Sequence, residues 1–231
     1  MAIELHYTPI PFDDTYVLYN ADDIFSLLSV FFTLLPIGIL VFYLSWFLTT
    51  REVEPVIMAA GQVVNDIINN VAKNHIKQVR PYNFEGFQAS GLRSGYGMPS
   101  AHSQFMGFFA TYLILRIWIQ WKGLSVLRKI ISTISLGALS WCVMYSRVYL
   151  YYHSVPQVLV GLGIGTTLGL VYYFTIDVLR SIGLVDYVLS WGLADWFHVK
   201  DSCYYEPLSL REERALWLNR REITKGKKKS Q

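Results

Sequence analysis

The stretch IFSLLSVFFTLLPIGILVFYLSWFLTT, residues 24–50, contains no charged side chain. A transmembrane helix needs about 20 mostly apolar residues, so this stretch is long enough to cross a bilayer. The residues before it are acidic, whereas a cleaved signal peptide would begin with a basic region. The sequence therefore predicts an integral membrane protein whose first span is retained.

The composition agrees with this prediction. Of 231 residues, 53% are hydrophobic and only 16% are charged, whereas about 25% are charged in ordinary soluble domains. The same figures exclude a disordered chain. The net charge of +3 is too small, and its carriers too scattered, for a nucleic-acid-binding protein. Cys142 and Cys203 cannot form a disulfide framework, so we expect two unpaired thiols.

Four further apolar stretches predict four more spans. The five predicted spans are Ile24 to Thr50, Pro55 to Ala72, Ser103 to Trp121, Ile130 to Tyr145 and Ser154 to Ile176. A later stretch, Ile182 to Val199, is apolar but is interrupted by Asp186 and Asp195. It is either a sixth span or a helix in the membrane interface, and we favour the second. The predicted fold is all-α, a polytopic membrane helix bundle of five or six spans.

This pattern divides the chain into four parts. They are an acidic N-terminal segment (1–23), a membrane domain (24–180), the undecided segment (181–199) and a basic tail (200–231). With five spans, fifteen of the twenty Lys and Arg fall on the side of the C-terminus. Positive loops face the cytosol, so the C-terminus is predicted to be cytosolic and the N-terminus to lie on the opposite side.

Five cations fall on that opposite side and need an explanation of their own. Three of them, Lys73, Arg80 and Arg147, lie in short segments at the ends of predicted spans. Lys73 and Arg80 are seven residues apart, so a continuous helix would place them on one face, until Pro81 ends it. The alternative is that these side chains only snorkel towards the membrane boundary.

The same side of the membrane receives Ser100, His102 and His153. Ser100 and His102 stand at the start of the third span, where free N–H groups of a helix attract anions; the alternative is an ordinary helix cap. His153 begins the fifth span, and Gln157 lies one turn deeper on the same face. Three cations with two histidines suit a phosphoryl group better than a metal. A zinc ion held by His102, His153 and His75 is the competing interpretation, which three adjacent cations disfavour.

Asp66 lies seven residues before Lys73, deeper in the second predicted span. Ionisable residues inside a membrane are usually paired or functional. We expect Asp66 to pair with Lys73 or with a neighbouring helix rather than to take a direct part in catalysis.

Three motifs follow one another along the chain: Lys-x6-Arg-Pro from Lys73, Pro-Ser-x-His from Pro99 and Ser-Arg-x5-His from Ser146. Together they resemble the signature of the phosphatidic acid phosphatase type 2 superfamily of lipid phosphatases. The phrases Tyr-Gly-Met-Pro-Ser-x-His-Ser-Gln-Phe-Met and Tyr-Ser-Arg-Val-Tyr-Leu-x-Tyr-His are most similar to the eukaryotic dolichyl-diphosphatases. Ala101 departs from the usual Gly, and Gln157 from the usual Asp that orients the nucleophilic His. An amide can set the tautomer but cannot stabilise an imidazolium with a full charge.

The resemblance implies a core of antiparallel helices with the site at the lumenal end, and a hydrolase that needs no metal or cofactor. It makes His153 the nucleophile and His102 the general acid and base. The implied phosphate-binding residues are Lys73, Arg80, Ser100 and Arg147, and the implied orienting residue is Gln157, with Asp66 in support.

The implied reaction is hydrolysis of dolichyl diphosphate, through a phosphohistidine, to dolichyl phosphate and inorganic phosphate on the lumenal face of the endoplasmic reticulum. This would recycle the lipid carrier of protein N-glycosylation. Two alternatives stay open. One is a related phosphatase acting on phosphatidate, a sphingoid-base phosphate or another polyprenyl diphosphate. The other is a small membrane transporter.

The basic tail supports the same compartment. Lys228 and Lys229 are the fourth and third residues from the C-terminus, a cytosolic dilysine pattern that coat proteins read as a retrieval address. The alternative is a basic tail held near anionic lipid.

Overall fold

The computed structural model describes residues 17, 23–81, 95–203 and 210–229; for 210, 213 and 224–229 only the backbone is described. Most of the acidic N-terminal segment therefore lies outside the described residues. The helices are α1 (Ile24–Thr50), α2 (Glu54–Ile76), α4 (Ala101–Leu115), the π-helical turn η2 (Arg116–Gln120), α5 (Val126–Tyr149), α6 (Val155–Ser181), α7 (Leu184–Leu189), α8 (Gly192–Trp196) and α9 (Leu210–Lys229).

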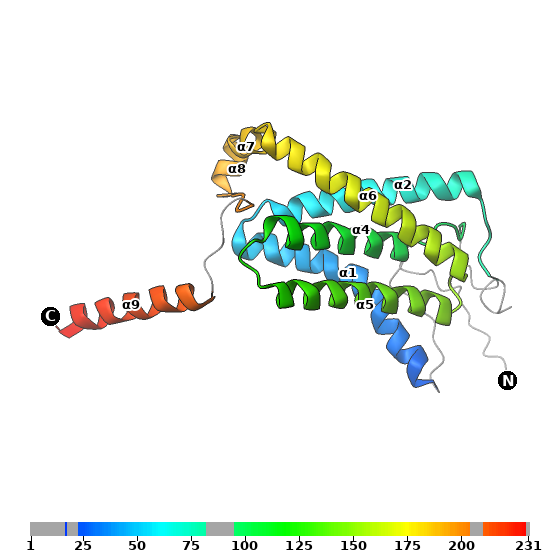
Figure 1. Cartoon of the computed structure of the whole chain (residues 1–231), viewed down its shortest axis with the longest axis horizontal. Helices are drawn as coiled ribbons and strands as arrows, with labels where there is room; N and C mark the ends of the chain where they lie inside the picture. Colours follow the sequence, from blue (N-terminus) through cyan, green and yellow to red (C-terminus); the bar gives the residue numbers. More distant parts are fainter. Residues whose placement is uncertain (1–16, 18–22, 82–94, 204–209, 230–231) are drawn as a thin grey trace, which may run out of the picture.

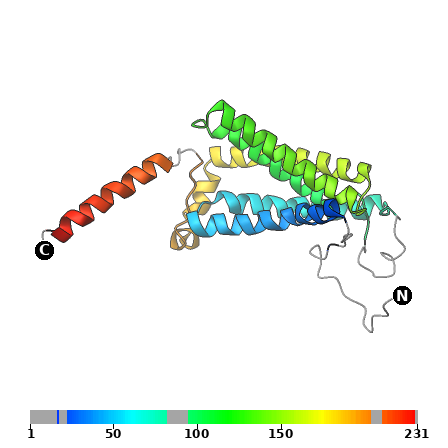
Figure 2. The same ribbon diagram turned by 90° about the horizontal axis from the view of Figure 1, so that it is seen from below.

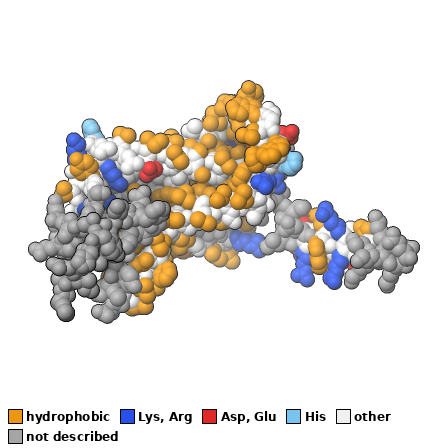
Figure 3. All heavy atoms as spheres, turned by 180° about the vertical axis from the view of Figure 1, so that it is seen from behind, with side chains coloured by type: hydrophobic (Ala, Val, Ile, Leu, Met, Phe, Trp, Pro, Cys, Tyr) orange, Lys and Arg blue, Asp and Glu red, His pale blue; other side chains and the backbone are white. Residues whose placement is uncertain are grey.

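Helices α1, α2, α4, α5 and α6 form the bundle, which confirms the predicted all-α membrane fold (Figure 1). By length and composition, α1, α5 and α6 can each cross a membrane. Helix α2 is amphipathic rather than uniformly apolar, and α4 packs between its neighbours. Seen from below in Figure 2, the helices lie along one common direction. Hydrophobic side chains cover the flank of the bundle in Figure 3, as a lipid-facing surface requires.

The tightest contact in the bundle joins α4 and α6. Gly161, Gly165 and Gly169 of α6 lie against the backbone of Ser100, Gln104 and Phe108, respectively. Residue numbers increase together along this contact, so α4 and α6 run parallel. This is expected because consecutive long helices alternate in direction and α5 lies between these two in the chain. A Cβ atom added at Gly161 would lie 2.5 Å from the Ser100 carbonyl oxygen. Glycine therefore lets the two backbones touch, as small residues do between membrane helices.

A cluster of buried charges holds the opposite end of the bundle together. Glu54 at the start of α2 contacts Arg116 at 2.7 Å and Arg180 at 2.5 Å, and it accepts a hydrogen bond from the Tyr112 hydroxyl at 2.8 Å. Arg180 also pairs with Asp201 at 2.8 Å. Two acids and two guanidiniums balance one another, which is the condition for keeping charges buried.

The segment 181–199 folds into the two short helices α7 and α8. They have six and five residues, and at about 1.5 Å per residue neither is long enough to cross a membrane. The chain then returns to the end of the bundle from which it left, because Lys200 N–H donates to the Arg51 carbonyl at 2.9 Å. Helix α8 and the residue before it expose apolar side chains such as Trp191, Leu193 and Trp196. This geometry favours the interfacial helix over the sixth span.

We expect Gly165→Ala to destabilise the protein and Gly163→Ala to leave it intact. At position 165 a Cβ would overlap the Gln104 carbonyl, whereas at position 163 nothing lies within 4 Å. Overpacking a tight contact costs about 1–3 kcal/mol, while alanine is the better helix former in open space. Thermal unfolding of both variants in detergent measures the difference. Equal melting temperatures would contradict the backbone contact.

Candidate active site

Four elements meet at the end of the bundle that carries the N-termini of α4 and α6. Lys73 lies in the last turn of α2, and Arg147 in the last turn of α5. Ser100 caps α4, the alternative that the Pro-Ser pattern left open. His153 precedes α6, and the Ser100 N–H donates to the Gln157 carbonyl at 3.1 Å. The parallel contact of α4 and α6 thus brings the second and third motifs together.

Arg80 reaches this region by a different route from the one predicted. The continuous helix expected from Lys73 to Pro81 is wrong, because α2 ends at Ile76 and Lys77 adopts a left-handed conformation with φ 53°. The Lys77 N–H still donates to the Lys73 carbonyl and closes the helix end. The non-helical residues 78–81 carry Arg80 back towards the bundle, where it lies within electrostatic range of His153.

The turn after α5 fixes His153 relative to Arg147. The backbone N–H groups of Tyr152 and His153 both donate to the Arg147 carbonyl at 3.0 Å. The Arg147 guanidinium lies 4.0 Å from the centre of the Tyr152 ring, within the range of a cation–π contact. His153 and Arg147 are each 4% exposed. The motif spacing Ser-Arg-x5-His therefore describes one compact turn.

Gln157 holds the imidazole of His153 from behind. Its Oε1 lies 3.2 Å from His153 Nδ1 and accepts from the Ser154 N–H at 3.3 Å. Its Nε2 donates to the Val79 carbonyl at 2.9 Å and to Gln78 Oε1 at 3.2 Å. A carbonyl can only accept, so the Nε2 group must face Val79, and Oε1 must then face His153. His153 is therefore protonated on Nδ1 and presents the lone pair of Nε2 to the site.

The sequence did not reveal the second contact of Gln157 or the glycine beside it. Gly97 packs so closely that an added Cβ would lie 2.6 Å from Gln157 Nε2, and its N–H donates to the Gln78 carbonyl at 2.7 Å. Residues far apart in sequence thus form one unit: Gln157 joins the nucleophile candidate to the segment that carries Arg80.

His102 lies in the first turn of α4 and is 7% exposed. It is within electrostatic range of Arg147, His153 and Lys73, and the backbone of Thr33 in α1 lies beside its ring. Thr33 itself is buried and bonds to Ser146 at 3.0 Å. Helix α1 thus borders the site next to His102, and nothing in the sequence motifs points to this.

The buried amide side chains of Asn69 and Gln104 connect α2 to the start of α4, next to Ser100. Asn69 donates to Gln104 Oε1 at 2.8 Å and to the Pro99 carbonyl at 3.4 Å. Gln104 in turn donates to the carbonyl and side chain of Asn65 at 2.8 and 2.9 Å. These contacts explain why the second predicted span carries asparagines: they fasten α2 to the start of α4. The Ser100 hydroxyl accepts from Ser103 Oγ at 3.1 Å.

Asp66 and His75 lie on the exposed face of α2. Asp66 accepts a hydrogen bond from Asn70 on its own helix at 3.0 Å, a partner different from those expected for it. Among the described residues, no three His, Cys, Asp or Glu side chains are grouped so that they could hold a metal ion.

The resulting site is positive and mostly buried. Lys73 and Arg80 are half-buried, whereas Arg147, His102 and His153 are buried. Burial, with the positive charges of Arg147 and Arg80, holds the pKa of His153 well below its ordinary value. The imidazole is therefore neutral at neutral pH, as a nucleophile must be. A neutral imidazole among three cations can accept a phosphoryl group whose negative charge the cations offset.

Comparison with known proteins agrees with this geometry. A model of the PAP2 superfamily matches residues 54–180. The chain is 50% identical over 218 residues to "Dolichyldiphosphatase" of Saccharomyces cerevisiae, covering 94% of this chain and 91% of the relative. It is 31% identical over 195 residues to "Dolichyldiphosphatase 1" of Homo sapiens, covering 81% and 80% of the two chains.

A solved structure shares the fold. The crystal structure of a transmembrane PAP2 type phosphatidylglycerolphosphate phosphatase from Bacillus subtilis superposes with a TM-score of 0.51 at 21% identity, covering 67% of this chain and 75% of that chain. The family match spans α2, α4, α5 and α6, which carry or flank every residue of the site. This confirms the resemblance seen in the three motifs, and the chain belongs to the PAP2 superfamily.

Proposed function

We propose that this protein hydrolyses dolichyl diphosphate to dolichyl phosphate and inorganic phosphate. The observation that carries the proposal is the position of His153, held at Nδ1 by Gln157 and within electrostatic range of Lys73, Arg80 and Arg147. Relatives that align over most of their length bear the name dolichyldiphosphatase. The site lies at the end of an apolar bundle, so a lipid can present its diphosphate there while its chain stays in the membrane.

The proposed reaction has two steps. First, His153 Nε2 attacks the terminal phosphorus, the bond from that phosphorus to the bridging oxygen breaks, and dolichyl phosphate leaves with a proton from His102. Second, a water molecule gives a proton to His102 and attacks the phosphohistidine, which releases inorganic phosphate.

Lys73, Arg80 and Arg147 offset the charge on the non-bridging oxygens, which is spread out in a loose transition state. The Ser100 hydroxyl and the first N–H groups of α4 add hydrogen-bond donors at the same place. The residues named supply nucleophile, proton carrier and anion binding.

The orientation in the membrane is part of the proposal. The side with more Lys and Arg, including Arg51, Arg116 and Arg180, would face the cytosol. The site would then face the lumen of the endoplasmic reticulum, where the reaction recycles the carrier for N-glycosylation. The basic tail, with α9 reaching Lys229, would lie in the cytosol. Lys228 and Lys229 could then serve as a retrieval signal for coat proteins; their side chains lie outside the described part.

Purified protein in liposomes should release phosphate from dolichyl diphosphate at least tenfold faster, by kcat/KM, than from phosphatidate or a sphingoid-base phosphate. The expected reason is that a diphosphate has the better leaving group. Malachite-green detection of phosphate with each lipid at several concentrations measures this preference.

The matched control is His153→Ala, which should remove turnover of all the lipids. Equal or faster hydrolysis of phosphatidate would overturn the dolichyl assignment. Lipid or ion flux that survives His153→Ala, with no phosphate release from the unaltered protein, would instead point to a transporter.

Dolichyl diphosphate labelled with ³²P at the terminal phosphate should transfer its label to the protein in a rapid-quench experiment. The label should be acid-labile and alkali-stable, as expected for a phosphohistidine, and should map to His153. His102→Ala should increase the labelled fraction, because activation of the water is lost while the cationic pocket remains. Turnover without any label on His153 would refute covalent catalysis.

Gln157→Glu should lower kcat, although it introduces a carboxylate beside the nucleophile. One carboxylate oxygen would face the Val79 carbonyl and Gln78 Oε1, which now accept hydrogen bonds from Nε2. The change would replace two part-buried hydrogen bonds with repulsion between oxygen atoms, so we expect a 10- to 100-fold loss in kcat with the protein still folded.

Gly97→Ala tests the same contact from the other side, because its Cβ would displace the Gln157 amide. It should also lower kcat, while Gly38→Ala, where nothing lies within 4 Å, should not. Full activity of both Gln157→Glu and Gly97→Ala would show that the amide does not position His153.

A further inference from the structure

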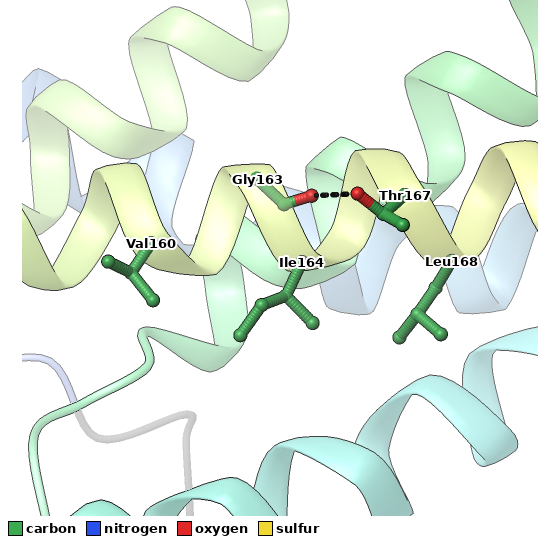
Figure 4. A pocket seen from close by; sticks show the side chains of 5 residues that line it. All are labelled: Val160, Gly163, Ile164, Thr167 and Leu168. Atoms are coloured by element: carbon green, nitrogen blue, oxygen red, sulfur yellow. Dashed lines mark hydrogen bonds between the residues drawn. The ribbon is translucent and has the colours of Figure 1, made fainter.

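An apolar groove runs along α6 below the site. It is lined by Val160, Gly163, Ile164, Thr167 and Leu168, all of α6, is open to its surroundings, and has a volume of about 410 Å³. In Figure 4 the side chains of Val160, Ile164 and Leu168 point from α6 towards α2. The Thr167 hydroxyl donates to the Gly163 carbonyl at 3.0 Å, so its polar group is already satisfied within the helix.

The stripe of α6 that lines the groove begins one turn earlier, at Gln157 of the site. Gln157, Val160, Ile164 and Leu168 are separated by three or four residues, so they form one stripe on a helix. The next residue of that stripe is Tyr172. At 1.5 Å per residue, Gln157 and Tyr172 are about 22 Å apart along the axis. Gln157, at the upper end of the stripe, touches His153.

Helix α6 is bonded at both ends of this stripe, at one end to the segment that follows α2 and at the other end to α2 itself. At the upper end Gln157 donates to the Val79 carbonyl at 2.9 Å. At the lower end the Tyr172 hydroxyl donates to the Ile57 carbonyl at 2.9 Å, and Arg180 pairs with Glu54. The groove lies between these two attachments, which fix the position of α6 relative to α2 on either side of it.

Gly163 differs from the other glycines of α6. Gly161, Gly165 and Gly169 have no room for a Cβ because α4 lies against them, whereas nothing lies within 4 Å of a Cβ at Gly163. Gly163 is therefore not needed for helix packing. Its missing side chain widens the groove instead.

We propose that this groove binds the isoprenoid chain of the lipid diphosphate. The inference rests on the proposed function, since the chain belongs to the substrate whose diphosphate would meet His153. An isoprenoid chain has no hydrogen-bonding groups, which matches a lining without free polar side chains. It also has methyl branches at regular intervals, which need more width than a straight acyl chain, and Gly163 provides that width. Binding the chain beside α6 would hold the diphosphate at the end of the same helix.

The test fills the groove without disturbing the packing. Gly163→Phe places a ring in open space, and Gly137→Phe does the same on the exposed surface of α5, where again nothing lies within 4 Å. The measured quantity is the ratio of kcat/KM for dolichyl diphosphate to kcat/KM for isopentenyl diphosphate, whose five-carbon chain is too short to reach the groove. Gly163→Phe should lower this ratio at least tenfold, and Gly137→Phe should leave it unchanged.

A ratio unaffected by Gly163→Phe, in a variant that melts like the unaltered protein, would overturn the groove while leaving the proposed function standing. Failure of the unaltered protein to hydrolyse dolichyl diphosphate would overturn both. Photolabelling with a polyprenyl diphosphate that carries a diazirine on an isoprene unit provides a second measurement. The label should fall on Val160, Ile164 or Leu168, and dolichyl diphosphate but not phosphatidylcholine should compete for it. Competition by phosphatidylcholine would show that ordinary bilayer lipid occupies the groove.

Discussion

The contact between α4 and α6 is the constraint on which the site depends. Without side chains at Gly161 and Gly165, the two backbones touch along two turns. The helices run parallel, so both N-termini arrive at the same end, and the backbone of Ser100 bonds directly to that of Gln157. The starts of two helices, where N–H groups have no partner inside the helix, are thereby held side by side. Any side chain in the contact would separate the nucleophile from the anion-binding helix end.

The two ends of the bundle hold their charges in opposite ways. At one end, Glu54 and Asp201 neutralise Arg116 and Arg180, and the result is a closed, buried cluster. At the other end Lys73, Arg80 and Arg147 lie within electrostatic range of His153. Since buried charges need a counter-charge, the first end is complete by itself. The second end gathers positive side chains beside the N-terminus of α4, an arrangement that attracts anions.

Much of this organisation was predictable, because hydropathy and charge act locally. The uncharged run 24–50 and the distribution of Lys and Arg indicate the membrane fold, and the three motifs indicate the residues of the site. The path of residues 78–81 was not predictable. No glycine marks the end of α2 at Lys77. The segment after this turn is held by Gln157, which lies 79 residues beyond Gln78 and bonds to it. A contact over that distance leaves no local pattern. The proximity of His102 to Thr33 of α1 is hidden for the same reason.

Gln157 connects the structure of the site to the kind of bond it can break. A carboxylate in its place would raise the pKa of His153 and stabilise the imidazolium that forms on phosphorylation. The amide fixes the same tautomer but adds no charge, so His153 stays a weakly basic nucleophile. A weakly basic nucleophile displaces a good leaving group more easily than a poor one. The leaving group of a lipid diphosphate is a phosphate, whereas that of a monoester is an alkoxide. The amide thus suits anhydride hydrolysis. Its second pair of hydrogen bonds, to Gln78 and Val79, also holds the segment that carries Arg80 in place.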